Sequence, residues 1–374
     1  MRVVQFLPYF PPHTGWVENI SQNIANNIIK YTDAQILIFT SDIWQNVKWY
    51  HRYSENWYEV ICVPSFEIIY NFPCFKFWTR GCRKAMKDLK KFNPDVIHTH
   101  TRFFLQTFHW WLWAKFHHKK WVHTEHGSGF VTWIWKVKEA IAWLYDQTLW
   151  RLVFSLADKI VSINEVNLKF ISKFAKASKC EVIYNWIEDY KIEKVKDNSW
   201  IVRLVYIGRL SPLKWVDVLL RSIKSSQEEW VNNFKLDIIW DWDEYDNLKK
   251  YIDENKLSNV KLLWKKSHDE IINSILPNTD ILINPSHQEW LPTTVLEWLI
   301  CKCVVVATDV WWTKEISDRW DLILVKAWGE NDLKEWIEKA LNDYEKLIWL
   351  SYELLKEKFS WKRNVKEYFR IYEE

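Results

Sequence analysis

Two glutamates, Glu289 and Glu297, stand eight positions apart across a predicted junction between a strand and a helix. The run 280–284 before them is short and apolar, as a buried strand is, and Pro292 is tolerated in the first turn of a helix. Eight positions span about two helical turns, so Glu297 lies within the helix and Glu289 in the loop before it. This arrangement predicts that one carboxylate binds the hydroxyls of a sugar on one side of a diphosphate and the other binds the hydroxyls of a ribose on its far side.

The start of the same helix predicts a phosphate site. Backbone N–H groups in a first helical turn have no partner within the helix, and the helix dipole places positive charge behind them. The segment concerned runs from Leu291 through Pro292 and Thr293 to Thr294. We therefore expect this turn to bind the phosphates of a donor molecule.

A second junction supplies two cations. The apolar run 201–207 predicts a buried strand, and Gly208, Arg209 and Lys214 follow it before an amphipathic helix. Ligands of open α/β sheets bind at the carboxyl ends of strands, which is where these residues lie. Arg209 can grip two phosphate oxygens and Lys214 acts as a point charge, so together they offset the charge that grows on a departing diphosphate. Ordinary surface cations are the alternative.

The wider pattern indicates the fold class. Short apolar runs alternate with helical stretches along the chain, which predicts an α/β fold with parallel, doubly wound sheets. A length of 374 residues suits two domains of ordinary size. The polar run 188–199 has no apolar periodicity and is typical of a linker between them.

These motifs resemble those of a known family. The pattern consists of Asn284-Pro-Ser-x-x-Glu289, Glu297, Gly208-Arg209-Leu-x-x-x-Lys214 and Val304-Val-Val-Ala-Thr308. It is similar to that of retaining glycosyltransferases of the GT-B fold, family four, also called glycosyl transferases group 1. The resemblance implies two Rossmann-like domains whose parallel sheets face a central cleft. It implies an acceptor-side domain at 1–187, a linker at 188–199, a nucleotide-sugar-binding domain at 200–350, and a C-terminal helix at 351–374 that packs back on the first domain.

The resemblance also implies an activity. A sugar would pass, with retention at its anomeric carbon, from a UDP- or GDP-linked donor to a hydroxyl of a glycan or lipid-linked acceptor in cell-envelope synthesis. Arg209 and Lys214 would hold the diphosphate, Glu297 the ribose and Glu289 the sugar hydroxyls. His126 matches the family histidine that reaches the donor sugar from the first domain. No cofactor and no metal are expected.

The composition departs from that of ordinary proteins. The chain has 29 Trp and 6 Gly in 374 residues, whereas glycine makes up about 7% of ordinary chains. So few glycines leave almost no residues free for left-handed turns and helix ends. Tryptophan stands where the resembled family has glycine, at Trp215, Trp290, Trp298, Trp311 and Trp312. We hypothesise that the source organism reads UGA as glycine; a truly tryptophan-rich protein is the alternative.

The first predicted loop carries the same exchange. Gly15 and Trp16 follow a predicted strand at 3–7 and precede a helical pattern. If Trp16 is glycine, the pair lets backbone amides approach a phosphate with no Cβ in the way, as in the first loop of the resembled family. A plain tight turn before a helix is the alternative.

Three further histidines lie near the ends of predicted strands. His98 and His100 are two positions apart, and with no third ligand in view we interpret them as loop residues lining an acceptor cleft rather than as a metal site. His123 competes with His126, but as a strand residue it is expected to be packed.

The stretch 76–91 is basic and amphipathic, with seven Lys and Arg against the single acid Asp88. A helix of this kind suits an anionic membrane surface. A solvated helix face is the alternative.

Charge, cysteines and hydropathy limit the setting. A net charge of +3 does not imply nucleic acid, and we expect no nucleic-acid partner. The six cysteines form no C-x-x-C pair and no zinc spacing, which indicates a reduced chain. The N-terminus lacks the features of a signal peptide, and no apolar run approaches the length of a membrane span. We expect a cytoplasmic protein, with peripheral association at the inner face of the cell membrane as a further expectation.

Two other functions stay open. A nucleotide-sugar epimerase of the same fold would be an isomerase with no acceptor, although the pair Glu289 and Glu297 argues against it. An inactive relative that only binds sugar nucleotides is favoured if the tryptophans are real.

Overall fold

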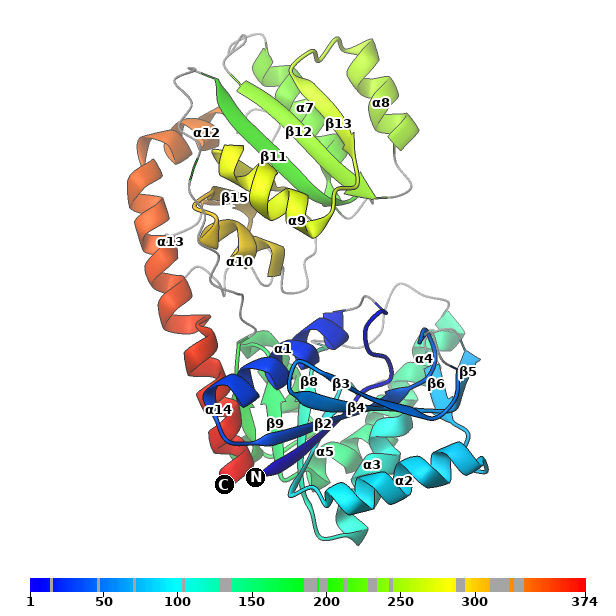
Figure 1. The fold of residues 1–374 in the computed structure, drawn as a ribbon. Coiled ribbons are helices and arrows are strands. Elements are labelled where there is room, and N and C mark those ends of the chain that lie inside the picture. Colours follow the sequence, from blue (N-terminus) through cyan, green and yellow to red (C-terminus); the bar gives the residue numbers. More distant parts are fainter. Residues whose placement is uncertain are drawn as a thin grey trace. The chain divides into compact units, whose positions relative to one another are not determined.

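The chain divides into two α/β units, each with its own sheet. The computed structural model describes residues 1–13, 16–45, 48–69, 72–102, 105–127, 136–184, 194, 201–210, 214–227, 234–241, 245–286, 293–309, 323–325 and 333–374. The first unit consists of Met1–Asn185 with Trp361–Glu374, and the second of Trp186–Ser360 (Figure 1). Each unit has its own sheet and its own hydrophobic core.

The first unit is built on an eight-stranded sheet in the order β10-β9-β8-β7-β1-β2-β4-β3. All neighbouring strands are parallel except β3, which pairs antiparallel with β4. The strands are β1 (Arg2–Phe6), β2 (Gln35–Ser41), β3 (His51–Glu55), β4 (Tyr58–Val63), β7 (Val96–His100), β8 (Lys120–Glu125), β9 (Lys159–Ser162) and β10 (Cys180–Val182). A separate antiparallel hairpin pairs β5 (Ser65–Ile69) with β6 (Phe72–Phe75).

Helices follow the strands of the first unit in sequence and pack on its sheet. They are α1 (Trp16–Tyr31), α2 (Arg80–Phe92), α3 (Leu105–Phe116), α4 (Lys136–Tyr145), α5 (Arg151–Leu156), α6 (Glu165–Ile171) and α14 (Trp361–Glu373), with short helical turns at Asp146–Trp150 and Ala177–Lys179. The core contains many rings; Trp110 of α3, for example, stacks on Phe6 of β1 with ring centroids 3.6 Å apart. Burial of such surface stabilises the unit and fixes the ends of its strands.

The basic stretch forms α2 with defined ends. The Thr79 hydroxyl accepts a hydrogen bond from the Cys82 N–H at the start, and Asn93 adopts a left-handed conformation at the end. Both are ordinary signals for the limits of a helix. The residues of α2 that are buried are Cys82, Ala85 and Leu89, while most of its lysines and arginines are exposed.

The second unit contains a six-stranded parallel sheet in the order β13-β12-β11-β14-β15-β16. The strands are β11 (Val202–Arg209), β12 (Phe234–Asp241), β13 (Val260–Trp264), β14 (Ile281–Asn284), β15 (Val304–Thr308) and β16 (Ile323–Val325). The helices are α7 (Val216–Gln227), α8 (Tyr245–Glu254), α9 (His268–Glu270), α10 (Thr293–Ile300), α12 (Leu333–Asn342) and α13 (Tyr344–Lys358), with short helical turns at Ile271–Ile275 and Leu276–Asn278. The alternation of strands and helices is the one that the sequence predicts.

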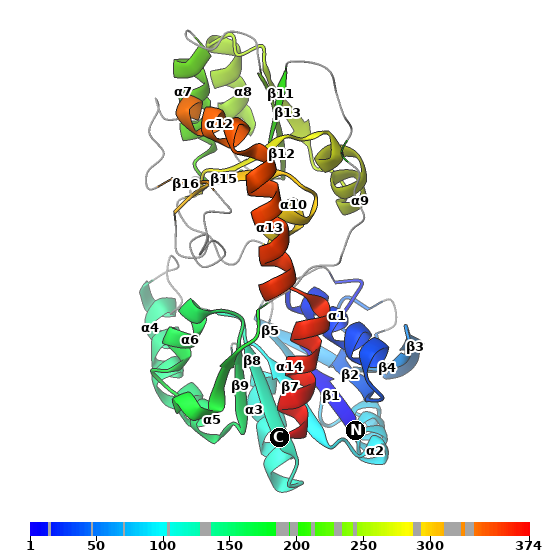
Figure 2. The same ribbon diagram turned by 90° about the vertical axis from the view of Figure 1, so that its left-hand side faces the viewer.

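The chain returns to the first unit later than the resemblance implies. The expected start of the returning segment is residue 351, but α13 belongs to the second unit and the return begins at Trp361. Leu347 of α13 lies in the core of the second unit, which explains why this helix stays there. The returning helix α14 packs beside α1 and against β8 (Figure 2). The Tyr372 hydroxyl of α14 lies 2.7 Å from Nδ1 of His98 in β7.

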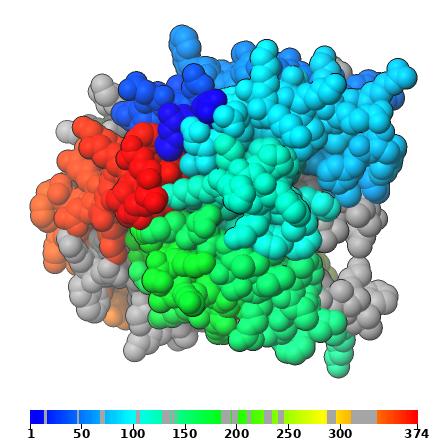
Figure 3. All heavy atoms as spheres, turned by 90° about the horizontal axis from the view of Figure 1, so that it is seen from below, coloured from blue at the N-terminus to red at the C-terminus, as the bar shows by residue number. Residues whose placement is uncertain are grey.

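The two ends of the chain lie side by side on one face of the first unit (Figure 3). Met1 lines a surface hollow together with Arg370 and Glu373 of α14. Within the part of the chain that the structure describes, no helix is both long enough and apolar enough to cross a bilayer.

Candidate functional site

The order of strands in the second unit defines a site. From β11 the sheet grows through β12 and β13 on one side and through β14, β15 and β16 on the other. The chain thus changes direction between β11 and β14, and open α/β sheets bind ligands outside the carboxyl ends of the strands at such a point. Gly208 and Arg209 end β11, and Asn284 ends β14.

Side chains hold the loop after β14 in place. The Ser286 hydroxyl donates to Oδ1 of Asn284 at 2.9 Å, and the Thr308 hydroxyl at the end of β15 donates to the Ser286 carbonyl. Nδ2 of Asn284 is buried and has no hydrogen-bond partner. These contacts fix the segment that directly follows β14. Glu289, further along the chain, lies outside the described residues.

Glu297 lies inside α10, in the helix that the sequence predicts there. Its neighbours Leu296 and Trp298 are buried in the unit, whereas Glu297 keeps part of its surface exposed. Burial raises the pKa of the Glu297 carboxyl, and the electrostatic interaction with His268 acts in the opposite direction. A half-buried carboxylate on the helix that follows β14 is suited to accept hydrogen bonds from the hydroxyl groups of a ligand.

The other predicted residues of this unit are resolved to different degrees. Lys214 lies two residues before the start of α7. At Gly208 a side chain would be crowded, because a Cβ there would lie only 2.9 Å from the Tyr206 hydroxyl. Backbone positions alone are described for Arg209 at the end of β11 and for Thr293 and Thr294 at the start of α10. Glu289, Leu291 and Pro292 lie outside the described part of the chain. In the first unit Gly15 also lies outside it, and for Trp16 only its place at the start of α1 is described.

The sheet of the first unit has a switch point of its own. β1 lies between β2 and β7, so the chain changes direction between β1 and β7. His100 ends β7, and the loop after β1 leads toward Gly15. His126 follows β8, the next strand beyond β7. His126 and His100 therefore lie at the edge of the sheet where a ligand is expected.

These two histidines contact each other. Nδ1 of His100 lies 3.2 Å from Nε2 of His126, and the two ring planes are inclined by only 25° with centroids 5.5 Å apart. Burial lowers the pKa of His126 to about 4 and holds that of His100 well below its usual range, so both rings are neutral near pH 7. The outer nitrogens, Nε2 of His100 and Nδ1 of His126, are buried without a hydrogen-bond partner.

A buried ion network holds the segment on which His126 lies. The Arg102 guanidinium is 1% exposed; its Nη1 donates to Oε1 of Glu125 and its Nε to Oδ1 of Asp146, each at 3.0 Å. Burial acts to raise the pKa of Glu125, but Arg102, His123 and the Gly127 N–H together outweigh it and lower that pKa to about 2. Glu125 is therefore a carboxylate inside the fold.

The interpretation of His98 and His100 as loop residues is wrong, because both belong to β7 and are buried. His98 Nε2 lies 2.8 Å from the Thr124 hydroxyl, and its Nδ1 meets Tyr372 of α14. His123 is packed, as expected, with its Nδ1 2.9 Å from the Thr99 hydroxyl. Among the described residues no three His, Cys, Asp or Glu side chains are grouped as metal ligands.

Sequence reasoning missed Arg102, Asp146 and the contact of His100 with His126. One signal was available: Glu125 lies in a predicted buried strand, and a buried carboxylate requires a cation. Arg102 and Asp146 lie far from Glu125 in the sequence, so the spacing of residues along the chain did not identify the cation.

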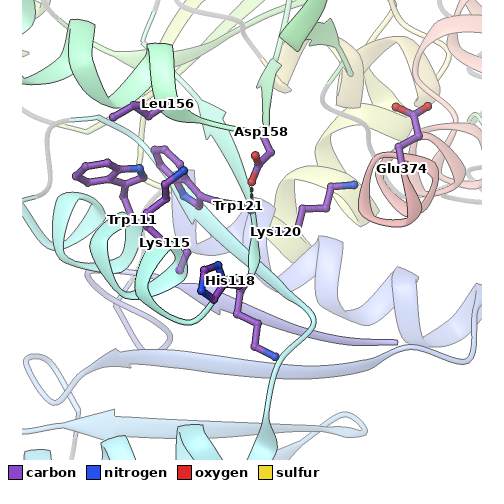
Figure 4. A pocket seen from close by; sticks show the side chains of 10 residues that line it. Trp111, Lys115, His118, Lys120, Trp121, Leu156, Asp158 and Glu374 are labelled. Atoms are coloured by element: carbon purple, nitrogen blue, oxygen red, sulfur yellow. Dashed lines mark hydrogen bonds between the residues drawn. The ribbon is translucent and has the colours of Figure 1, made fainter.

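A cavity of about 580 Å³ opens elsewhere in the first unit, where β8 and β9 begin (Figure 4). Its lining includes Lys115, Lys120 and Asp158, and Asp158 accepts a hydrogen bond from the Trp121 N–H at 2.8 Å. None of the predicted site residues lines it. This cavity is at the amino ends of the strands, away from the switch point.

Comparisons with known proteins agree with the two-unit division. Residues 189–352 match the family described as Glycosyl transferases group 1, and residues 45–190 match the one described as Glycosyltransferase Family 4. An uncharacterized glycosyltransferase of Methanocaldococcus jannaschii is 28% identical over 100% of this chain and 98% of its own length.

Solved structures show the same fold. Sucrose-phosphate synthase from Thermosynechococcus elongatus superposes with a TM-score of 0.75 at 15% identity, covering 100% of this chain and 98% of that one. The Anabaena protein HepE, solved in complex with UDP and glucose, gives 0.66 at 15% identity, covering 99% and 98%. The two family matches together span residues 45–352, so this chain is a glycosyltransferase whose second unit matches the glycosyl transferases group 1, and the shared architecture shows the GT-B fold.

Proposed function

We propose that the protein transfers a sugar from a UDP- or GDP-linked donor to a hydroxyl acceptor with retention at the anomeric carbon. The observation that carries this proposal is the switch point of the second unit. Gly208 and Arg209 end β11 on one side of it. On the other side, hydrogen bonds hold the end of β14, and α10 with Glu297 comes next in the chain. HepE, which has the same fold, was solved with UDP and glucose.

The residues take the following roles in this proposal. Arg209 and Lys214 hold the diphosphate, Glu297 accepts hydrogen bonds from the ribose hydroxyls and Glu289 from those of the sugar. His126 contacts the donor sugar. The backbone N–H groups of Gly15 and Trp16, and those of Leu291, Thr293 and Thr294 around Pro292, donate to the phosphates. Two cations and a helix start neutralise the phosphates, so no metal is required.

Retention requires that the new bond form on the face from which the diphosphate leaves. The acceptor oxygen bonds to the anomeric carbon as the bond from that carbon to the diphosphate oxygen breaks. The proton of the acceptor hydroxyl passes to the departing diphosphate. Arg209 and Lys214 stabilise the negative charge on that leaving group, which is greatest in the transition state.

The surface around α2 supports an acceptor held at an anionic membrane, as in the synthesis of cell-envelope glycans or lipid-linked saccharides. Phe66 of β5 and Phe77, which precedes α2, are 37% and 42% exposed near the basic face of α2. Cations with neighbouring exposed rings favour the boundary between headgroups and acyl chains. Co-sedimentation with vesicles of phosphatidylglycerol, compared with phosphatidylcholine, tests this; equal sedimentation with both would contradict it.

We also propose that many of the tryptophans are glycines in the native protein. Trp44, Trp57 and Trp215 have φ angles of 67°, 88° and 50°, in the left-handed region. That region costs an L-residue about 1 to 2 kcal/mol and suits glycine. Trp57 is also 92% exposed, so no packing of its indole compensates. Peptide mass spectrometry of protein from its native source decides the matter, and tryptophan found at 57 and 215 would refute recoding.

The activity is tested by incubating the protein with UDP-glucose, UDP-galactose, UDP-N-acetylglucosamine and GDP-mannose, with and without a hydroxyl acceptor such as an alkyl glycoside. The protein is made with the residues that mass spectrometry identifies. We expect release of nucleoside diphosphate that rises with acceptor and a product whose anomeric configuration equals that of the donor. An epimerised donor as the sole product would favour an isomerase, and binding without turnover would favour an inactive relative.

A further inference from the structure

We propose that His100 is a positioning residue that fixes which ring nitrogen of His126 carries the hydrogen. The inference rests on the proposed function, because it takes His126 as the side chain that meets the donor sugar. His100 does not itself touch substrate in this account. It acts through its ring contact with His126, the residue that follows β8.

Both rings are neutral, so the contact between them has only two forms. Either Nε2 of His126 donates to Nδ1 of His100, or Nδ1 of His100 donates to Nε2 of His126. In the first form Nδ1 of His126 is a bare acceptor, and in the second it is an N–H donor. The hydrogen on His100 therefore determines what His126 presents to a sugar hydroxyl, as second partners do for other functional histidines.

The backbone of His126 is held on both sides, which leaves the ring as the variable part. The Gly127 N–H donates to Oε1 of Glu125 at 2.6 Å, and Nδ2 of Asn167 donates to the Glu125 carbonyl at 2.6 Å. Arg102 closes this arrangement by its bond to Glu125. Since the main chain is fixed, the rotation and tautomer of the His126 ring depend mainly on His100.

The remaining histidines of this region have other partners. His98 bonds to Thr124 and Tyr372, and His123 bonds to Thr99. His100 is the one described histidine within hydrogen-bond distance of His126. The unsatisfied Nδ1 of His126 is the observation that a purely structural pair does not explain, because buried ring nitrogens in a settled core normally have partners.

Three substitutions separate positioning from packing. His100→Asn puts an amide atom where Nδ1 stands and preserves a partner for Nε2 of His126. His100→Gln carries its amide one carbon further out and loses that contact, although it remains polar. His100→Phe preserves a ring without nitrogen. The comparison of Asn with Gln remains decisive if the Phe variant does not fold.

The readout is the pair of ring-nitrogen resonances of His126 in protein labelled with ¹⁵N-histidine, assigned by their loss in His126→Gln. We expect one tautomer in the wild type and in His100→Asn, and a mixture in His100→Gln and His100→Phe. The release of UDP from UDP-glucose, or of GDP from GDP-mannose, should fall about tenfold in kcat for Gln, with little change in KM. His100→Asn should stay close to the wild-type rate.

An unchanged His126 spectrum in His100→Gln, or equal loss of activity in Asn and Gln, would overturn the proposal. If the wild type turns over none of the four nucleotide sugars named for the activity test, the proposed function fails, and the nitrogen resonances still decide whether His100 sets the tautomer of His126.

Discussion

The hydroxyl of Tyr372, in the last helix of the chain, lies 2.7 Å from Nδ1 of His98 in the middle of the first sheet. Both side chains are buried, and burial holds the pKa of His98 well below its usual range and raises that of Tyr372. The pair joins residues that are 274 positions apart in sequence. α14 is therefore part of the core of the first unit.

Tyr372→Phe should destabilise the first unit by about 1 to 3 kcal/mol, because Nδ1 of His98 is left buried without a partner. The measurement is the urea midpoint of unfolding. Tyr352→Phe is the matched control, since Tyr352 is 39% exposed on α13. Equal midpoints for the two variants would show that the contact with His98 contributes nothing.

Arg102→Met should destabilise the first unit by about 3 to 5 kcal/mol, because two buried carboxyls lose their cation. Arg52→Met removes an exposed ion pair with Glu59 in the same unit and should cost less than about 1 kcal/mol. Denaturant titration of both variants checks the difference. A small effect of Arg102→Met would mean that Glu125 and Asp146 do not depend on this guanidinium.

The buried histidines make stability depend on pH. The pKa values of His98, His100 and His126 are lowered in the fold, so below the unfolded value of about 6.5 the unfolded chain binds protons that the folded chain does not. Stability is complete above that pH and falls as the pH drops toward 4, by up to about 1.4 kcal/mol per pH unit for each histidine.

Urea midpoints measured at pH 7.5, 6.5, 5.5 and 4.5 check this dependence on pH. His98→Asn should make the decline shallower, whereas His117→Asn, at an exposed position after α3, should leave it unchanged. An identical decline in both variants would remove His98 as a cause.

Glu297→Gln should raise KM for the nucleotide sugar about tenfold or more while the fold is retained, because a neutral amide accepts ribose hydroxyls less strongly than a carboxylate does. Glu254→Gln, exposed at the end of α8, is the control. Initial rates at varied donor concentration give KM. A loss in kcat alone would place Glu297 in the chemical step instead of in donor binding.

EDTA should leave the transfer rate unchanged if the two cations and the start of α10 suffice for the phosphates. Rates before and after dialysis against EDTA, and after return of Mg²⁺ or Mn²⁺, provide the measurement. Activity that disappears with EDTA and returns with one of these ions would contradict a metal-independent reaction.

Strongly apolar runs made the parallel sheets predictable. The run 201–207 corresponds to β11 and the run 280–284 to β14, because buried strands of parallel sheets are almost continuously apolar. β3 and the hairpin of β5 with β6 were missed. β3 alternates between half-buried and exposed residues at the edge of its sheet, so its sequence does not differ from that of a loop.

The site was less predictable than the fold. Spacing placed Glu297 within a helix and His126 at the end of a strand, since both depend on local sequence. The partners of Glu125 and His126 depend on which strands become neighbours, a long-range property that local patterns do not contain. Arg102 and His100 therefore became visible only in the fold.

The late return of the chain has a consequence for its biogenesis. β7 and β8 are translated before the second unit, whereas Tyr368 and Tyr372, which contact Thr124 and His98, are translated after it. Until then, the nascent first unit must remain with an uncovered flank while the second unit is synthesised and can already fold. A chain released before residue 361 would leave that flank open to chaperones and proteases.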